Sequence, residues 1–254
     1  TSGRLTWEGG NSIWLGRATS ISVLILLTLF MSNKMKVSRF LILFIPAIFI
    51  TLSTGSKGPL FSIFISLLIV FLGNIINLLK IRKNINRLFI FTTLFAIAIY
   101  ISNSLFPGTF DRLLNIFASE STYQRTLLFD DAINTISTNP FGVGLGNFKN
   151  YSYFDYPHNI ILEAFVELGW IPALIFIGFL IVSFVGLKNS SKQSVINKVF
   201  FGIFTFSLIN SMVSGDLTSP KELYLLMPIG LNYFISNKNT EMNDVSIKQK
   251  LASS

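Results

Sequence analysis

His158 is the residue of this sequence best suited to acid–base chemistry, and it is the single histidine. It opens a segment that leads from a polar stretch to the apolar run at Trp170. An imidazole with a pKa of about 6.5 can accept a hydroxyl proton at neutral pH, so His158 is a candidate general base. The alternative is a histidine at a helix start that bonds to backbone at a membrane interface. With one histidine and no cysteine, a multi-histidine metal site and thiol chemistry are both excluded.

Three cationic residues could hold an anion such as a phosphate group. Arg125 falls in the first turn of a predicted helix, where the helix dipole disfavours a cation unless an anion binds both. Arg17 lies inside the first apolar run, near its N-terminal end, and Lys57 lies in a turn whose small neighbours allow close approach of a phosphate. The alternatives are a solvated arginine for Arg125, snorkelling to lipid headgroups for Arg17, and an ordinary loop lysine for Lys57.

The acidic residues indicate sugar or proton chemistry without a metal. Glu163 and Glu167 are four residues apart, a like-charge pair on one helix face that a proton or a cation would relieve. Either carboxyl group could orient His158 or bind sugar hydroxyls. Asp130 and Asp131 are adjacent, so on a helix they diverge by about a hundred degrees and do not chelate together. The chain also has no Asp-x-Asp sequence, and we expect neither a metal nor a cofactor.

The elements that must position these residues are membrane helices. The chain is 51% hydrophobic and 13% charged, with 26 Phe and a mean hydropathy of +0.60, which is typical of a protein dissolved in lipid. Several apolar runs approach the roughly 20 residues that an α-helix needs to cross a bilayer. We therefore expect one all-α, polytopic membrane domain over 1–254 with about seven spans. The spans run over Ile13–Met31, Phe40–Leu52, Leu60–Leu79, Leu88–Phe106, Trp170–Leu187, Val195–Val213 and Leu223–Ile235.

The basic residues predict the orientation of these spans, because Lys and Arg in short loops stay in the cytoplasm. Basic residues without acids occupy three loops, which are Ser32–Arg39, Lys80–Arg87 and Lys188–Lys198. The alternate connections, Ser53–Gly58, 107–157 and Ser214–Lys221, lack this excess and face outward. The polar tail at 237–254 then lies in the cytoplasm. The net charge of +8 is therefore a topology signal and does not indicate nucleic-acid binding.

The outer loop at 107–157 is long enough to indicate a function. Ser121 to Gln124 has the spacing of a capping box. Phe129, Ile133 and Ile136, with Leu128 and Ala132 beside them, recur at helical intervals. We predict an amphipathic helix over 121–138 that ends before Pro140.

Two motifs together carry a resemblance to a known family. One is Pro157-His158-Asn159 followed after nine residues by Gly169, and the other is the glycine-punctuated segment from Asn139 to Phe148. Their combination resembles the O-antigen ligase and O-antigen polymerase family of bacterial membrane proteins, and the chain is similar to the C-terminal half of a member. Tyr123-Gln124-Arg125 resembles the arginine of the family's outer loop, and Arg17 resembles a second family arginine by its position.

The resemblance leaves ligase and polymerase unresolved. The ligase form usually has a small residue or Tyr three positions after the motif glycine, where this chain has Pro172. The polymerase pattern asks for an arginine with a glycine eleven positions later, and no arginine of this chain has one.

What the resemblance implies is a glycosyltransferase of surface polysaccharide biosynthesis, such as that of lipopolysaccharide or capsule. Its donor would be a glycan on undecaprenyl diphosphate and its acceptor a hydroxyl group of a glycan or lipid, at the outward face of the bacterial cytoplasmic (inner) membrane. Arg17 and Arg125 would hold the departing diphosphate without a metal, and His158 would take the acceptor proton. Further substrate contacts would come from Lys57, Asn159, Glu163 and Glu167.

A polytopic transporter or exporter of polysaccharide or small solutes is the rival interpretation. Such proteins ordinarily place charges near mid-span or break paired helices with Gly and Pro. Here the charges avoid mid-span positions, apart from Glu163 and Glu167 in the segment that re-enters the membrane. A non-catalytic scaffold would leave the ordered outer loop unexplained.

The predicted topology can be tested with single cysteines, because the chain has none of its own. A cysteine at Ser137 should react with a membrane-impermeant thiol reagent added outside intact cells, and one at Ser191 should react only after the membrane is opened. Labelling in the opposite sense would contradict the orientation of every span.

Overall fold

The computed structural model describes residues 5–6, 11–72, 82–105 and 120–252. Within them every regular element is a helix, which confirms the all-α class. The α-helices are α1 (Ser12–Met31), α2 (Val37–Ser53), α3 (Lys57–Leu72), α5 (Arg82–Leu105), α7 (Glu120–Thr138), α8 (Ile160–Glu163), α9 (Trp170–Ser190), α10 (Val195–Val213) and α11 (Lys221–Ala252). The 3₁₀-helix η1 (Phe148–Asn150) and the π-helix η2 (Ala164–Leu168) complete the described elements.

Three of the described helices, α1, α9 and α10, are long and apolar enough to cross a membrane. Shorter apolar helices cover Val37–Ser53, Lys57–Phe71 and Thr92–Ser102. The predicted spans Leu60–Leu79 and Leu88–Phe106 each run partly outside the described residues. The total of about seven spans, like the outward position of 107–157, therefore stays a prediction.

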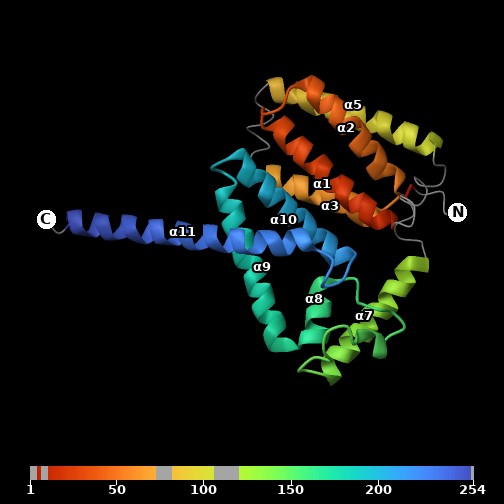
Figure 1. Ribbon diagram of the computed structural model, residues 1–254. Coiled ribbons are helices and arrows are strands. Elements are labelled where there is room, and N and C mark those ends of the chain that lie inside the picture. Colours follow the sequence, from red (N-terminus) through yellow and green to blue (C-terminus); the bar gives the residue numbers. More distant parts are fainter. Residues whose placement is uncertain (1–4, 7–10, 73–81, 106–119, 253–254) are drawn as a thin grey trace.

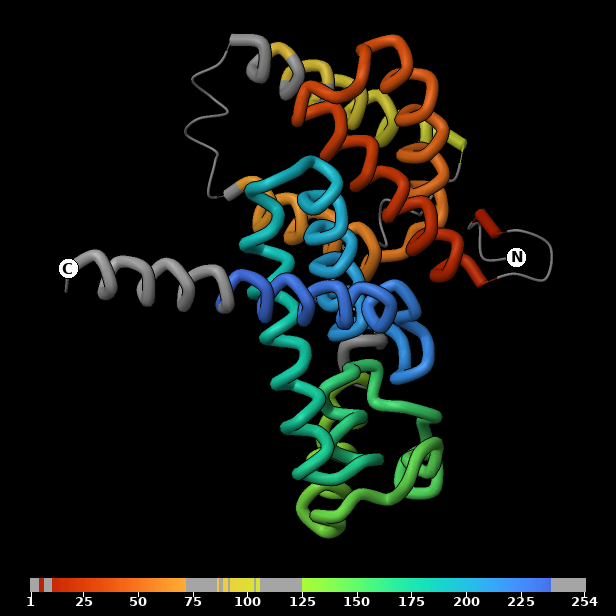
Figure 2. The backbone as a smooth tube through the Cα atoms, turned by 60° about the vertical axis from the view of Figure 1, so that its left-hand side comes forward, coloured from red at the N-terminus to blue at the C-terminus, as the bar shows by residue number. Residues whose placement is uncertain are grey.

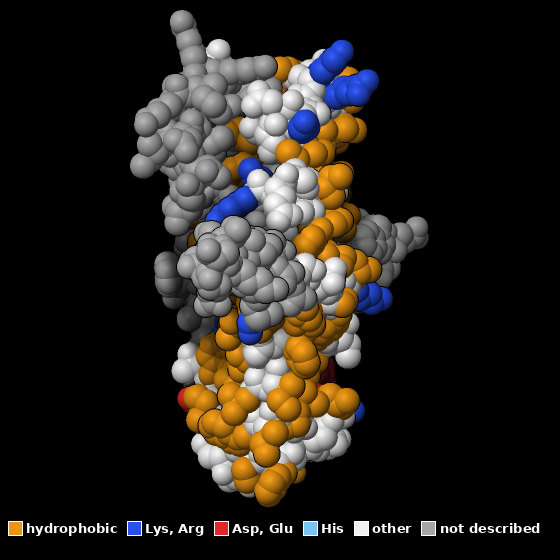
Figure 3. Space-filling model, turned by 90° about the vertical axis from the view of Figure 1, so that its left-hand side faces the viewer, with side chains coloured by type: hydrophobic (Ala, Val, Ile, Leu, Met, Phe, Trp, Pro, Cys, Tyr) orange, Lys and Arg blue, Asp and Glu red, His pale blue; other side chains and the backbone are white. Residues whose placement is uncertain are grey.

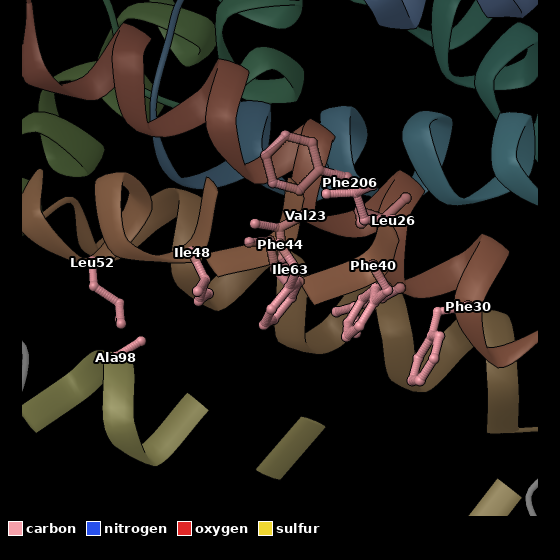
Figure 4. Close-up of a cluster of buried hydrophobic side chains, with 12 residues drawn as sticks. Val23, Leu26, Phe30, Phe40, Phe44, Ile48, Leu52, Ile63, Ala98 and Phe206 are labelled. Atoms are coloured by element: carbon pink, nitrogen blue, oxygen red, sulfur yellow. The ribbon is translucent and has the colours of Figure 1, made fainter. Parts of the chain in front are cut away.

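One helix bundle combines α1, α2, α3, α5 and α10 (Figure 1). Helix α2 contributes Phe40, Phe44, Ile48 and Leu52, which recur every four residues and form one buried stripe. Phe30 of α1 stacks on Phe40 with ring centroids 4.0 Å apart, and Phe40 stacks on Phe44 at 4.7 Å. Figure 4 shows these rings between α1 and α2, with Phe206 of α10 completing the cluster. This packing fixes the ends of α1 and α10 relative to each other.

Helix α9 connects this bundle to a separate lobe, which consists of α7, α8, η2 and the segment between α7 and α8 (Figures 1 and 2). Helix α11 crosses α9 at a very close approach of two backbones. A Cβ atom on Gly186 of α9 would lie 2.0 Å from the carbonyl oxygen of Gly230 of α11. Helix α11 then continues without a break to Ala252, so the predicted polar tail at 237–254 is helical over most of its length.

Helix α7 differs from the amphipathic helix that the sequence predicts. Its buried residues include Leu128, Ala132 and Thr135, at 1%, 0% and 4% exposure. Of the other predicted apolar positions, Ile136 packs against the cluster of Ala132, Phe148 and Val166, whereas Phe129 and Ile133 are 38% and 56% exposed, so the prediction was wrong at those two positions. The physical reason is that α8 and η2 pack on the line through 128, 132 and 135, which is rotated by about a hundred degrees from Phe129.

The start of α7 corrects a second expectation. The helix begins at Glu120, so Ser121 lies within it and does not occupy the cap position. Arg125 is therefore the sixth residue and lies in the second turn, where the dipole acts on it less.

The crossing of α9 and α11 makes a prediction about stability. Gly186→Ala should force the two helices apart and lower the melting temperature of the detergent-solubilised protein, by roughly the 1–3 kcal/mol typical of overpacking. Gly178→Ala is the matched control on the same helix, because no atom lies within 4 Å of its Cβ position. Equal melting of the two variants would contradict the close approach of α9 and α11.

Candidate functional site

Arg17 of α1 is bound by the loop between α10 and α11, residues 214–220. Its Nη2 donates to the carbonyl oxygen of Ser214 at 3.2 Å, and its Nη1 donates to that of Ser219 at 3.3 Å. In the amide orientation of Asn210 that satisfies both groups, Oδ1 accepts from Nε at 2.9 Å and from Nη2 at 3.0 Å. All three acceptors are neutral, so these bonds fix the guanidinium group without cancelling its charge.

Gly215 allows this close contact. Its φ is +115°, a region that side chains disfavour, and a Cβ atom there would lie 2.9 Å from Arg17 Nη2. The loop backbone can therefore wrap around the guanidinium group only with a glycine at this position.

Glu163 of α8 holds the same loop from the other side. Its Oε2 accepts a hydrogen bond from the Leu217 N–H at 3.0 Å, and the residue is only 4% exposed. Burial raises the pKa of Glu163 to about 8, and the nearby charges of Glu167 and Asp216 push it in the same direction against the bond from Leu217. The carboxyl group is thus largely protonated at pH 7, which relieves the repulsion from Glu167 that the spacing predicts.

Asn159 positions His158 through bonds to two elements. Its Oδ1 caps α8 by accepting from the N–H groups of Ile161 and Leu162 at 3.0 and 3.1 Å. Its Nδ2 donates to the carbonyl oxygen of Met212 at 3.2 Å, which ties the start of α8 to α10. These contacts serve the fold, and the substrate contact expected of Asn159 stays a prediction.

His158 itself is partly buried, with a left-handed backbone at φ +54° that is uncommon for a residue with a side chain. Its ring packs edge-on against Tyr156, with centroids 4.4 Å apart. Burial lowers the pKa of His158 and the charge of Arg125 lowers it further, whereas the charge of Asp216 raises it. The imidazole is therefore held in its neutral form at pH 7, which is the form that accepts a proton.

The remaining predicted residues lie on three different elements. Arg125 is exposed on α7, within electrostatic range of His158. Lys57 begins α3, and the Cβ position of the next residue, Gly58, is 3.5 Å from Cβ of Ser214. Glu167 is buried in η2, where its carbonyl oxygen accepts from the Gly144 N–H at 2.9 Å.

The structure also explains why Gly169 follows His158-Asn159 at a fixed spacing. The nine residues between Asn159 and Gly169 are the whole of α8 and η2. We call these two consecutive helices the α8–η2 rod. The glycine-punctuated segment crosses the rod at Gly169, where a Cβ atom on Gly169 would lie 2.4 Å from the carbonyl carbon of Phe141. Gly142 is equally restricted, since its Cβ position is 2.5 Å from the carbonyl oxygen of Glu167. The two motifs are therefore one packed unit.

Sequence reasoning missed four residues of this site, which are Tyr156, Asn210, Asp216 and Tyr224. Tyr224 donates from its hydroxyl group to the carbonyl oxygen of Leu217, and Asp216 stabilises its own turn by accepting from Thr218. A polar amide near the end of an apolar run was an available signal for Asn210. For Asp216 the sequence offered a weaker signal than for Asn210, namely an acidic residue in a loop predicted to face outward.

The arrangement defines a helical membrane protein in which the end of α10 and the loop after it hold Arg17, the buried carboxyl group of Glu163 and the start of α8 next to His158. The sequence model of the O-antigen ligase family matches residues 41–177, which is more than half of the chain. The chain belongs to this family. The match runs from α2 into α9 and includes Lys57, Arg125 and His158, while Arg17 and the 214–220 loop lie outside it. No curated protein and no solved structure matches the chain.

The raised pKa of Glu163 predicts how stability depends on pH. The folded protein keeps this proton up to about pH 8, whereas an ordinary glutamate loses it near 4.5, so stability falls as the pH rises through that window. Glu163→Gln keeps an acceptor for the Leu217 N–H without titrating. Its melting temperature should therefore exceed that of the wild type at pH 8.5 and match it near pH 5.

Glu163→Ala is the matched variant, since it leaves the Leu217 N–H without this acceptor. It should lose stability at both pH values, by about 1–3 kcal/mol. A constant difference between the wild type and the glutamine variant across this range would show that Glu163 is ionised in the folded protein.

Proposed function

We propose that this protein is a glycosyltransferase of the O-antigen ligase or polymerase type, acting at the outward face of the bacterial cytoplasmic membrane. It would take a glycan from an undecaprenyl-diphosphate donor and transfer it to a hydroxyl group of a glycan or lipid acceptor. The observation that carries the proposal is the setting of His158, a partly buried imidazole kept neutral at pH 7. Arg125 lies within electrostatic range of it, and the charge of Arg17 acts on Tyr156, the ring that packs against it. Membership of the family favours this enzyme over the polytopic exporter.

In the proposed reaction, His158 takes the proton of the acceptor hydroxyl group as its oxygen attacks the anomeric carbon of the donor. The bond from that carbon to the diphosphate oxygen breaks, and the diphosphate leaves with the electron pair. The proton held by the imidazole then passes to solvent or to the leaving group. One bond forms, one breaks, and the histidine is regenerated.

The cations would stabilise the negative charge that develops on the diphosphate. Arg125 is exposed on α7 and can offer two parallel hydrogen bonds to phosphate oxygens. Arg17 is held by the 214–220 loop, so it supplies a fixed positive charge, and Lys57 lies at the start of the neighbouring α3. In this proposal guanidinium groups take the place of a metal ion.

Arg125 would have a second effect, on the base itself. Its charge lowers the pKa of His158, and binding of an anionic diphosphate to Arg125 would offset that charge. The imidazole would become a stronger base once the donor is bound. Donor binding and proton removal are thereby coupled through one arginine.

The proposed base is tested by the pH dependence of transfer with a lipid-linked donor. His158→Ala should reduce transfer by about two to four decades while donor binding persists, because proton transfer is lost. Wild-type transfer should decline on the acid side as the imidazole becomes protonated, at a pH below the roughly 6.5 of an ordinary histidine, because burial and Arg125 lower the pKa of His158. The residual transfer of the alanine variant should lack this decline. If the wild type and the alanine variant show the same decline at low pH, another group takes the proton.

Two charge-neutralising variants sharpen this test. Arg125→Gln removes a charge that lowers the pKa of His158, so the acid limb should move to higher pH. Asp216→Asn removes a charge that raises this pKa, so the limb should move to lower pH. Shifts in these opposite directions are expected of an imidazole at this place, and a limb unmoved in both variants would contradict the assignment.

A further inference from the structure

An exposed apolar patch lies where the glycine-punctuated segment meets the start of α9. We call Phe141, Leu145, Trp170 and Ile171 the tip patch. These side chains are 90%, 70%, 49% and 69% exposed. Large apolar side chains that lie together on a surface mark a site of contact with a protein or a membrane.

The tip patch is built rigidly into the lobe. The Trp170 N–H donates to the carbonyl oxygen of Pro140 at 3.1 Å, and the Gly144 N–H donates to that of Glu167 at 2.9 Å. The backbone of Phe141 packs directly against Gly169, where no side chain would fit. The backbone on either side of Phe141 and Leu145 is therefore held in place, with both side chains exposed.

The tip patch continues the lipid-facing surface of α9. This helix is a candidate span, and Leu174, Ile175 and Phe179 are exposed along it at 55%, 56% and 47%. Figure 3 shows hydrophobic side chains spread without a large charged area over the lower part of the molecule. Because lipid is the partner of a membrane-spanning helix, the same lipid borders the residues that adjoin its first turn.

Charge and aromatic content also fit a membrane. The segment from Asn139 to Phe148 contains no charged residue, so no charge in it opposes insertion of its two apolar side chains. The next residue, Lys149, is exposed and basic, as residues at the level of phosphate headgroups often are. Trp170 at the start of α9 is the residue type favoured at a membrane–water interface.

We propose that Phe141 and Leu145 insert into the outer leaflet of the bilayer beside Trp170 and Ile171. The lobe is then anchored to the membrane at two places, through α9 and through the tip patch, and it lies along the surface. A consequence, which rests on the proposed function, is that His158 and Arg125 are kept at headgroup level, where the diphosphate of a lipid-linked donor is found.

Site-directed spin labelling of the full chain tests this insertion, since every engineered cysteine is unique. Phe141→Cys and Leu145→Cys would each carry a nitroxide in the protein reconstituted into phosphatidylethanolamine–phosphatidylglycerol bilayers. Tyr153→Cys is the matched control, because Tyr153 is fully exposed in the same outer segment and the chain between η1 and α8 runs on the side of the lobe away from α9 (Figure 2). Collisions are measured with oxygen, which concentrates in lipid, and with a water-soluble nickel chelate.

We expect oxygen to relax the labels at 141 and 145 at least several-fold more effectively than the chelate, and the reverse at 153. Labels at 141 and 145 that behave like the label at 153 would place the tip patch in water and overturn the proposal. Protection of both labels from both reagents would also overturn it, by showing a protein partner or a second copy on the patch. The readout involves no transfer reaction, so its failure leaves the proposed function standing, and the loss of the proposed function leaves the insertion standing.

Discussion

The hydrogen bonds of Arg17 are the interaction on which the arrangement of the site depends. A guanidinium group inside an apolar bundle needs acceptors, and here they come from Asn210, Ser214 and Ser219, nearly two hundred residues away along the chain. By binding this loop, Arg17 sets the position of the Leu217 N–H, which Glu163 then reaches from α8. The start of α8 carries Asn159 and His158. One cation thus connects the first helix to the histidine through a continuous set of polar contacts.

Charges of both signs surround the site, since Glu222 and Asp216 act on Arg17, and Arg125 and Asp216 act on His158. Glu163 is largely protonated at pH 7, so its burial adds little negative charge beside the arginines. Arg17 is bound by neutral oxygens, and Arg125 is exposed and acts on His158 from α7. Asp216 provides a counterweight of opposite sign. A region with fixed positive charge and a neutral base suits an anionic leaving group, and the same charges hold the imidazole in the form that can act.

The helices and several site residues could be predicted from the sequence, because apolar run length and residue type are local properties. The run Val195–Val213 coincides with α10, and Ile13–Met31 differs from α1 by one residue. For α7 the sequence offers two adjacent apolar stripes, one through Leu128 and Ala132 and one through Phe129 and Ile133. Which of the two is buried could not be predicted, since it depends on which neighbour packs there. The contact of Arg17 with the 214–220 loop was likewise invisible, because it joins residues from opposite ends of the chain. The effect of Asp216 on His158 could not be predicted for the same reason, since it depends on how the loop lies in three dimensions.

The rod formed by α8 and η2 has a consequence for how this family can vary. Its C-terminal end packs against the glycine-punctuated segment at Gly169, and its N-terminal end follows directly after His158 and Asn159. In an α-helix such as α8 each residue turns the chain by about a hundred degrees and advances it by about 1.5 Å, and in the wider π-helix η2 each residue turns it by less. A single inserted or deleted residue would therefore rotate the imidazole out of register with α7, whereas an apolar substitution within the rod would leave the register intact. The number of residues between Asn159 and Gly169 is therefore more constrained than the identity of those residues.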